Sequence, residues 1–79
     1  MEVFTMFKQL KAKKELNAIR AEIDANLKNN YRAPAQAARV KFGQRVDELY
    51  HDGVINLKTY KDYKLIYGEY CEKMEDFGH

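Results

Sequence analysis

The sequence predicts an all-α protein, a three-helix bundle with a long first helix and an antiparallel hairpin of two shorter helices. Three observations support this fold. Residues 2–28 contain neither Gly nor Pro and are rich in residues that favour helix interiors. A short Asp52-Gly53 break separates two further helical segments. Large apolar residues then recur every three or four positions in the last segment, which is typical of a helix that buries one face: Tyr60, Tyr63, Tyr67, Tyr70, Met74 and Phe77.

The first helix is predicted over residues 2–28, and its apolar residues fall into two groups. The later group is spaced as one buried stripe: Ala12, Leu16, Ile19, Ile23 and Leu27. The earlier group consists of Val3, Met6, Phe7 and Leu10. At about 100° per residue, the mean directions of the two groups differ by about 150°. A straight helix therefore cannot bury both against the same neighbour.

The second helix is predicted over about residues 34–51, after a break at residues 29–33. Pro34 is tolerated in a first helical turn because its missing amide hydrogen would have no partner there. The predicted buried stripe is Ala35, Ala38, Phe42, Val46 and Leu49. Gly43 costs roughly 1 kcal/mol relative to alanine in a helix interior, so we expect it to permit a close approach by a neighbour.

The third helix is predicted over about residues 57–75. Gly53 supplies the left-handed conformation that ends the second helix, and Asn56 is a suitable N-cap for the third. Closing this hairpin predicts the following pairs: Leu49 with Tyr60, Val46 with Tyr63, Phe42 with Tyr67, Ala38 with Tyr70 or Cys71, and Ala35 with Met74.

The tyrosines of the third helix have two interpretations. They could form a platform on which nucleic-acid bases stack. They could instead be core residues whose rings are buried and whose hydroxyls reach the rim. The second interpretation is favoured because no other continuous apolar face exists on this helix. Tyr31 and Tyr50 lie off the stripe and carry no separate signal.

Composition sets broad limits on the protein. Its 79 residues suit one domain, residues 1–79. The single cysteine, Cys71, cannot form an intramolecular disulfide, which favours a reducing compartment. No apolar run has the length of a membrane span, and the start lacks the pattern of a secretory signal. A cytoplasmic location is therefore expected.

Motifs for catalysis or metal binding are not found in the sequence. His51, His79 and Cys71 are the soft metal ligands, and no two of them have the spacing of a metal site. Gly-rich phosphate loops and nucleophile elbows are also not found. We therefore predict neither an enzyme nor a bound metal or cofactor.

The N-terminal group suggests a contact surface. Aligning the first helix antiparallel to the second leaves residues 1–10 projecting beyond the hairpin turn, with lysines around the apolar side chains. The predicted partner-binding residues are Val3, Met6, Phe7, Leu10, Lys11 and Lys14. In the alternative arrangement, the segment bends back so that Phe4, Phe7 or Leu10 covers Val54 and Ile55.

The favoured function is a small protein-protein interaction module, such as a regulator or inhibitor, that binds a larger protein or a second copy of itself as a homodimer. The alternative is weak nucleic-acid binding, because residues 1–45 carry ten Lys and Arg against four acids, a net +6. Its predicted residues are Lys8, Lys11, Lys13, Lys14 and Arg20, with Arg32, Arg39 and Arg45 as further contributors. The pI of 8.7 is low for such a protein. A third interpretation, less favoured, is adsorption of the N-terminal segment to an anionic membrane surface.

Overall fold

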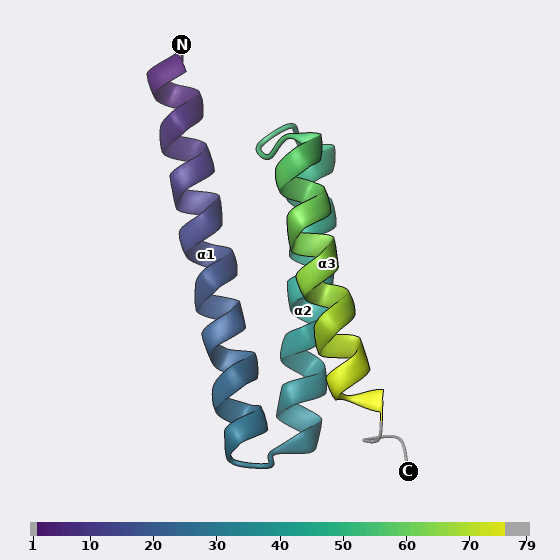
Figure 1. Cartoon of the computed structure of the whole chain (residues 1–79). Coiled ribbons are helices and arrows are strands. Elements are labelled where there is room, and N and C mark those ends of the chain that lie inside the picture. Colours follow the sequence, from purple (N-terminus) through teal and green to yellow (C-terminus); the bar gives the residue numbers. More distant parts are fainter. Residues whose placement is uncertain (1, 76–79) are drawn as a thin grey trace.

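The computed structural model describes the backbone of residues 2–75 and the side chains of residues 6–75. It contains three helices, α1 (Glu2–Lys28), α2 (Arg32–His51) and α3 (Leu57–Lys73). α1 runs antiparallel to α2, and α2 to α3 (Figure 1). The bundle is elongated, 48 by 19 by 14 Å. The predicted three-helix bundle with its long first helix and its hairpin of α2 and α3 is confirmed.

A tight connection joins α1 to α2. Asn30 adopts a positive φ of 59°, a conformation that asparagine tolerates better than most residues. This lets the Tyr31 amide donate back to the Asn26 carbonyl at 2.8 Å, which closes the end of α1. α2 can therefore begin at Arg32, two residues earlier than predicted. Pro34 still lies in the first turn.

The turn between α2 and α3 is built as predicted. Gly53 has a φ of 74°, which favours glycine, and its amide donates to the Tyr50 carbonyl at 3.0 Å. The Asn56 side chain caps α3 by accepting a hydrogen bond from the Thr59 amide at 2.9 Å. Because the turn is short, α3 must return along α2.

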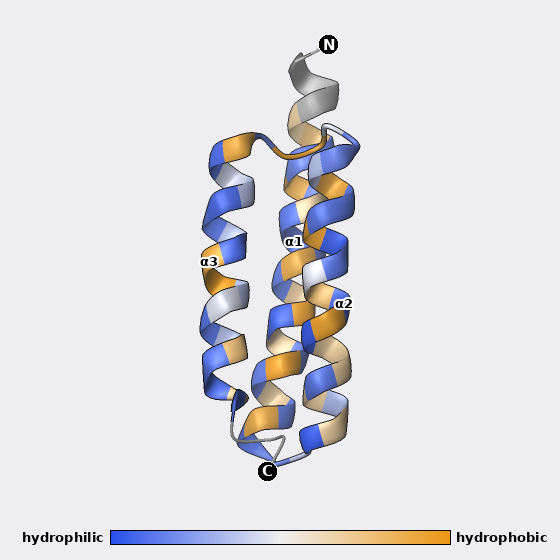
Figure 2. Ribbon diagram, turned by 90° about the vertical axis from the view of Figure 1, so that its right-hand side faces the viewer, coloured by the Kyte–Doolittle hydropathy of each residue, from blue (hydrophilic) through white to orange (hydrophobic). Residues whose placement is uncertain are grey.

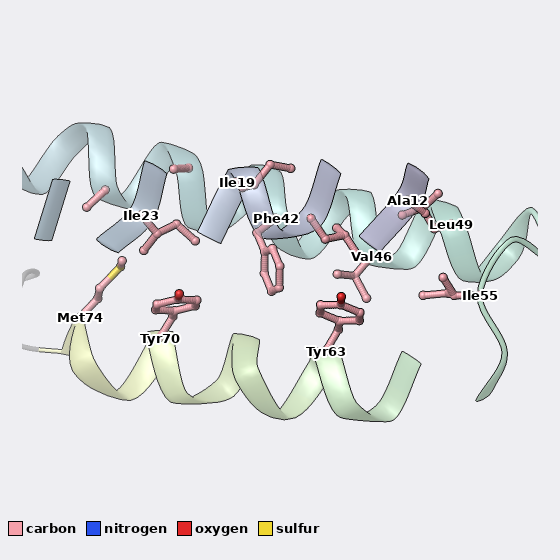
Figure 3. Packing of buried hydrophobic residues seen from close by; sticks show 13 residues of the cluster. Ala12, Ile19, Ile23, Phe42, Val46, Leu49, Ile55, Tyr63, Tyr70 and Met74 are labelled. Atoms are coloured by element: carbon pink, nitrogen blue, oxygen red, sulfur yellow. The ribbon is translucent and has the colours of Figure 1, made fainter. Parts of the chain in front are cut away.

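The core lies where the three helices face one another (Figure 3). Its buried residues are Ala12, Leu16, Ile19, Ile23, Ala35, Ala38, Phe42, Val46, Leu49, Ile55, Tyr63, Tyr70 and Met74. The predicted stripe of α2 is buried in full, and that of α1 is buried from Ala12 to Ile23, with Leu27 partly covered. The Phe42 ring lies between Tyr63 and Tyr70, with edge-on contacts at centroid distances of 6.0 and 6.1 Å (Figure 3).

The tyrosines of α3 divide into two pairs. Tyr63 and Tyr70 are buried, whereas Tyr60 and Tyr67 are half-buried beside the core. Tyr67 lies over Gly43, where an added Cβ would be 2.6 Å from the ring, so the close approach expected at this glycine is confirmed. Phe42 is predicted to face Tyr67, but its ring contacts are instead with Tyr63 and Tyr70, about one turn to either side of that level.

The side of the hairpin nearest the turn has its own aromatic contact. The rings of Tyr50 and Tyr60 are stacked, with centroids 4.2 Å apart and planes inclined by 19°. The Tyr60 hydroxyl donates to Asp47 at 2.9 Å. No pattern in the sequence predicts a role for Tyr50, since it lies outside the stripe of α2. Phe77, the last residue of the predicted α3 stripe, lies outside the described residues.

Candidate interaction site

The N-terminal end of α1 extends beyond the turn that joins α2 to α3 (Figures 1 and 2). Met6, Phe7 and Leu10 are the apolar residues of this end whose side chains are described, and they are 59, 67 and 62% exposed. Lys11 and Lys14 flank them on the helix surface and are also exposed. We refer to these five residues as the N-terminal patch. Val3, the sixth predicted member, has a side chain outside the described part of the chain.

The helix remains continuous through this end, so the patch does not fold back. Phe7 and Leu10 are exposed and leave Val54 only half-buried, while Ile55 is buried within the main core. The alternative arrangement, in which Phe7 or Leu10 covers the turn, is therefore wrong for these two residues. The Phe4 side chain is outside the described part. The physical reason is the phase difference: burial of Ala12 and Leu16 fixes the rotation of α1, and that rotation directs the earlier group away from α2.

A small open groove lies at the base of the projecting end. Lys8 and Lys11 of α1 line one side, and Leu49 and Val54 of the hairpin line the other. Glu15 and Arg45 bound the groove and hold each other through two hydrogen bonds of 2.7 and 3.2 Å. This paired contact is charge-assisted and fixes α1 against α2 just below the point where α1 loses its neighbour. The helix that carries the patch is therefore held against α2 by this contact.

The patch has a strongly basic surround. Residues 6–14 include four lysines and no acidic residue, the lysines being Lys8, Lys11, Lys13 and Lys14. All four are exposed. Lys14 lies beside the apolar group around the helix, and Lys11 and Lys13 lie at its two edges. Lys8 is on the side of α1 that faces the hairpin, where it lines the groove with Leu49 and Val54. An apolar centre with a charged rim is the usual composition of a protein contact surface.

Arg20 is separated from these lysines. It is half-buried, and its guanidinium forms a hydrogen bond with the Tyr70 hydroxyl, which is the main reason that the Arg20 pKa is raised. The same hydroxyl donates to Asp24 at 2.9 Å. Arg20 thus joins α1 to α3 at the rim of the core. The five predicted nucleic-acid contacts do not form one surface.

The remaining predicted cations are also engaged within the fold. The Arg39 guanidinium donates to the Cys71 sulfur at 3.0 Å and lies 6.0 Å from the centroid of the Tyr67 ring. Arg45 binds Glu15, as described above, and lies 3.6 Å from Glu48. Arg32, at the start of α2, also has an interaction partner. These contacts hold Arg39 and Arg45 against other side chains of the fold.

The tyrosine platform interpretation does not fit the structure for the two central residues. Tyr63 and Tyr70 lie in the core, and burial is the main cause that raises the pKa of each hydroxyl. The four tyrosines of α3 consequently do not present their faces together to solvent. They are core and rim residues, as the favoured interpretation predicted.

The described residues include no group of three His, Cys, Asp or Glu side chains arranged to hold a metal ion. None of the described helices is both long and apolar enough to cross a membrane. Comparisons with family models, curated proteins and solved structures give no match to this chain.

A second exposed apolar surface lies on α3, and sequence reasoning missed it. Leu65 is 70% exposed on the side of α3 that faces away from the core, and Gly68 lies one turn further on. An open groove passes over both residues and is flanked by lysines and glutamates. The signal was present in the sequence as a seam of three- and four-residue spacings opposite the tyrosines. Because most of its members are charged, this seam does not stand out as an apolar stripe.

Proposed function

We propose that this chain is a non-enzymatic interaction module that docks on a larger protein through its N-terminal patch. The main support is the exposure of Met6, Phe7 and Leu10 on a continuous helix end, where no other described element covers them. Isolated exposed apolar residues are ordinary on protein surfaces, but a contiguous group with a charged rim is characteristic of contact sites.

Charge favours a different protein over a second copy as the occupant. Two patches facing each other would bring Lys11 and Lys14 of both copies together, and residues 6–14 contain no acid to offset them. A partner with an apolar groove and acidic rim would instead attract the segment and speed its association. A helix that inserts one face into a groove is a common way of binding.

The free energies of burial and association indicate that firm binding needs more contact area than the patch alone provides. Burying three large apolar side chains contributes at most ~1.5 to 3 kcal/mol each, whereas association costs ~4 to 15 kcal/mol. The groove between Lys8, Lys11 and Val54 adjoins the patch and offers further contact area. We therefore expect a partner that contacts both the projecting helix end and the hairpin turn.

The test uses a photo-crosslinking amino acid at position 10, with Phe7→Asp in the same chain as the disrupting change. A specific adduct is expected at Leu10 and should be lost with Phe7→Asp, and the purified partner should bind the wild-type chain directly. The matched control is Val40→Asp, which alters an exposed apolar residue elsewhere and should leave the adduct intact. Persistence of the adduct in a folded Phe7→Asp variant would contradict the proposal.

Nucleic-acid binding is the competing outcome of the same design. Fluorescence anisotropy with labelled single and double strands at ~50 mM salt measures it directly, since phosphate contacts are strongest at low salt. Binding that survives Phe7→Asp but is lost when Lys11 and Lys14 are replaced by Glu would favour that function over the protein partner.

A further inference from the structure

We infer that the outer face of α3 is a weak self-association surface on which a second copy packs antiparallel, α3 against α3. The six residues that carry this inference are Lys61, Lys64, Leu65, Gly68, Glu69 and Glu72, and we call them the outer seam. They line one open groove on the exposed side of α3. Figure 2 shows α3 at one side of the bundle, with α1 and α2 at the other, so neither of these two helices covers this face of α3.

The outer seam has the spacing that helix pairs use. Lys61, Leu65, Gly68 and Glu72 follow one another at four, three and four residues, which keeps them on one side of the helix. This side lies opposite the buried Tyr63 and Tyr70. α3 therefore has two seams, one for its own core and one directed outward.

The centre of the outer seam is complementary to itself in shape. Leu65 is 70% exposed, and a Cβ placed on Gly68 would meet no atom within 4 Å. The two residues lie at equal distances on either side of the Ile66–Tyr67 peptide. In an antiparallel pair with its two-fold axis there, Leu65 of each copy lies over Gly68 of the other, and the contact occurs twice.

The charges of the outer seam obey the same symmetry. Lys64 and Glu69 are equidistant from that peptide, as are Lys61 and Glu72. An antiparallel second copy therefore places each lysine opposite a glutamate. A parallel copy would place lysine against lysine. Among the described residues, Lys61, Glu69 and Glu72 make no ion pair within their own chain, while Lys64 lies 3.5 Å from Asp47. The order of charges thus selects both the occupant and its direction.

The test compares three chains by sedimentation equilibrium over a range of concentrations: wild type, Lys61→Glu and Glu72→Lys. In each variant dimer, like charges would oppose each other at both symmetry-related contacts, so we expect at least ~10-fold weaker association. An equimolar mixture of the two variants should recover association, because every opposed pair then has opposite charges. Circular dichroism checks that both variants remain helical, as expected for changes at exposed positions.

Three results would overturn the inference. The first is a wild-type chain that stays monomeric up to ~1 mM, the upper limit of a weak interface. The second is a single variant that associates as strongly as the wild type. The third is a mixture of the two variants that does not recover association. Gly68→Ala gives an independent check, because it fills the space for the opposing Leu65 while adding a residue that favours helix. Association should fall as the melting temperature rises. Phe7→Asp should leave self-association unchanged, so failure here is distinguishable from failure of the N-terminal docking proposal.

Discussion

The interior of the bundle and its two exposed apolar surfaces are built from the same residue types but differ in whether a neighbour is present. Phe42 is enclosed by two tyrosine rings, whereas Phe7 is 67% exposed at the end of α1. Gly43 lies under a ring, whereas Gly68 faces open space. Hydrophobicity alone therefore does not locate the core of a small bundle. The rotation of each helix, fixed by its best-matched stripe, decides which apolar residues are left outside.

Replacing Phe42 and Phe7 by alanine should give the largest difference in the free energy of unfolding. Phe42→Ala removes a fully buried ring and should lower the free energy of unfolding by ~3 to 5 kcal/mol. Phe7→Ala removes an exposed ring and should change it by less than ~0.5 kcal/mol. Urea unfolding followed by circular dichroism measures both. A similar loss in the two variants would mean that the N-terminal patch is covered in solution.

This contrast also shows what sequence can predict. The three helices, the Gly53 turn, the Asn56 cap and the stripe from Ala35 to Leu49 followed from local chemistry and periodicity. The depth of each tyrosine did not, because all four share one stripe in the sequence, whereas only Tyr63 and Tyr70 are buried in the structure. Tyr67 instead lies over Gly43. The exposure of the N-terminal patch followed from helix phase, but its partner depends on a molecule that the sequence does not contain.

Replacing Gly43 and Gly68 by alanine should change the free energy of unfolding in opposite directions. Gly43→Ala places a Cβ 2.6 Å from Tyr67, and the displaced ring should cost more than the helix gains, a net loss of about 1 kcal/mol. Gly68→Ala meets no such obstacle and should stabilise the monomer by ~0.5 to 1 kcal/mol. Melting temperatures of the two variants, taken at low concentration, should lie on either side of the wild type. Stabilisation by both would show that Tyr67 moves aside freely.

The tyrosine hydroxyls are expected to affect stability by a similar amount and to make it depend on pH. Burial raises the pKa of Tyr63 and Tyr70, so the unfolded chain releases these protons first as pH rises above ~10. The folded state then binds more protons than the unfolded state, and stability should fall with rising pH. Tyr70→Phe should cost about 1 kcal/mol at pH 7 through its lost hydrogen bonds and should flatten the alkaline decline. An unchanged decline, measured by urea unfolding at several pH values, would show that Tyr70 contributes little to it.

The stacked rings of Tyr50 and Tyr60 have a practical consequence for watching this molecule fold. The chain has no tryptophan, so its near-ultraviolet signal comes chiefly from its tyrosines. Two phenol rings held 4.2 Å apart couple their transitions, and that coupling exists only while α2 and α3 are joined at their turn. Near-ultraviolet dichroism therefore offers an intrinsic optical reporter of hairpin closure that needs no added label. Tyr50→Phe would silence it and identify its source.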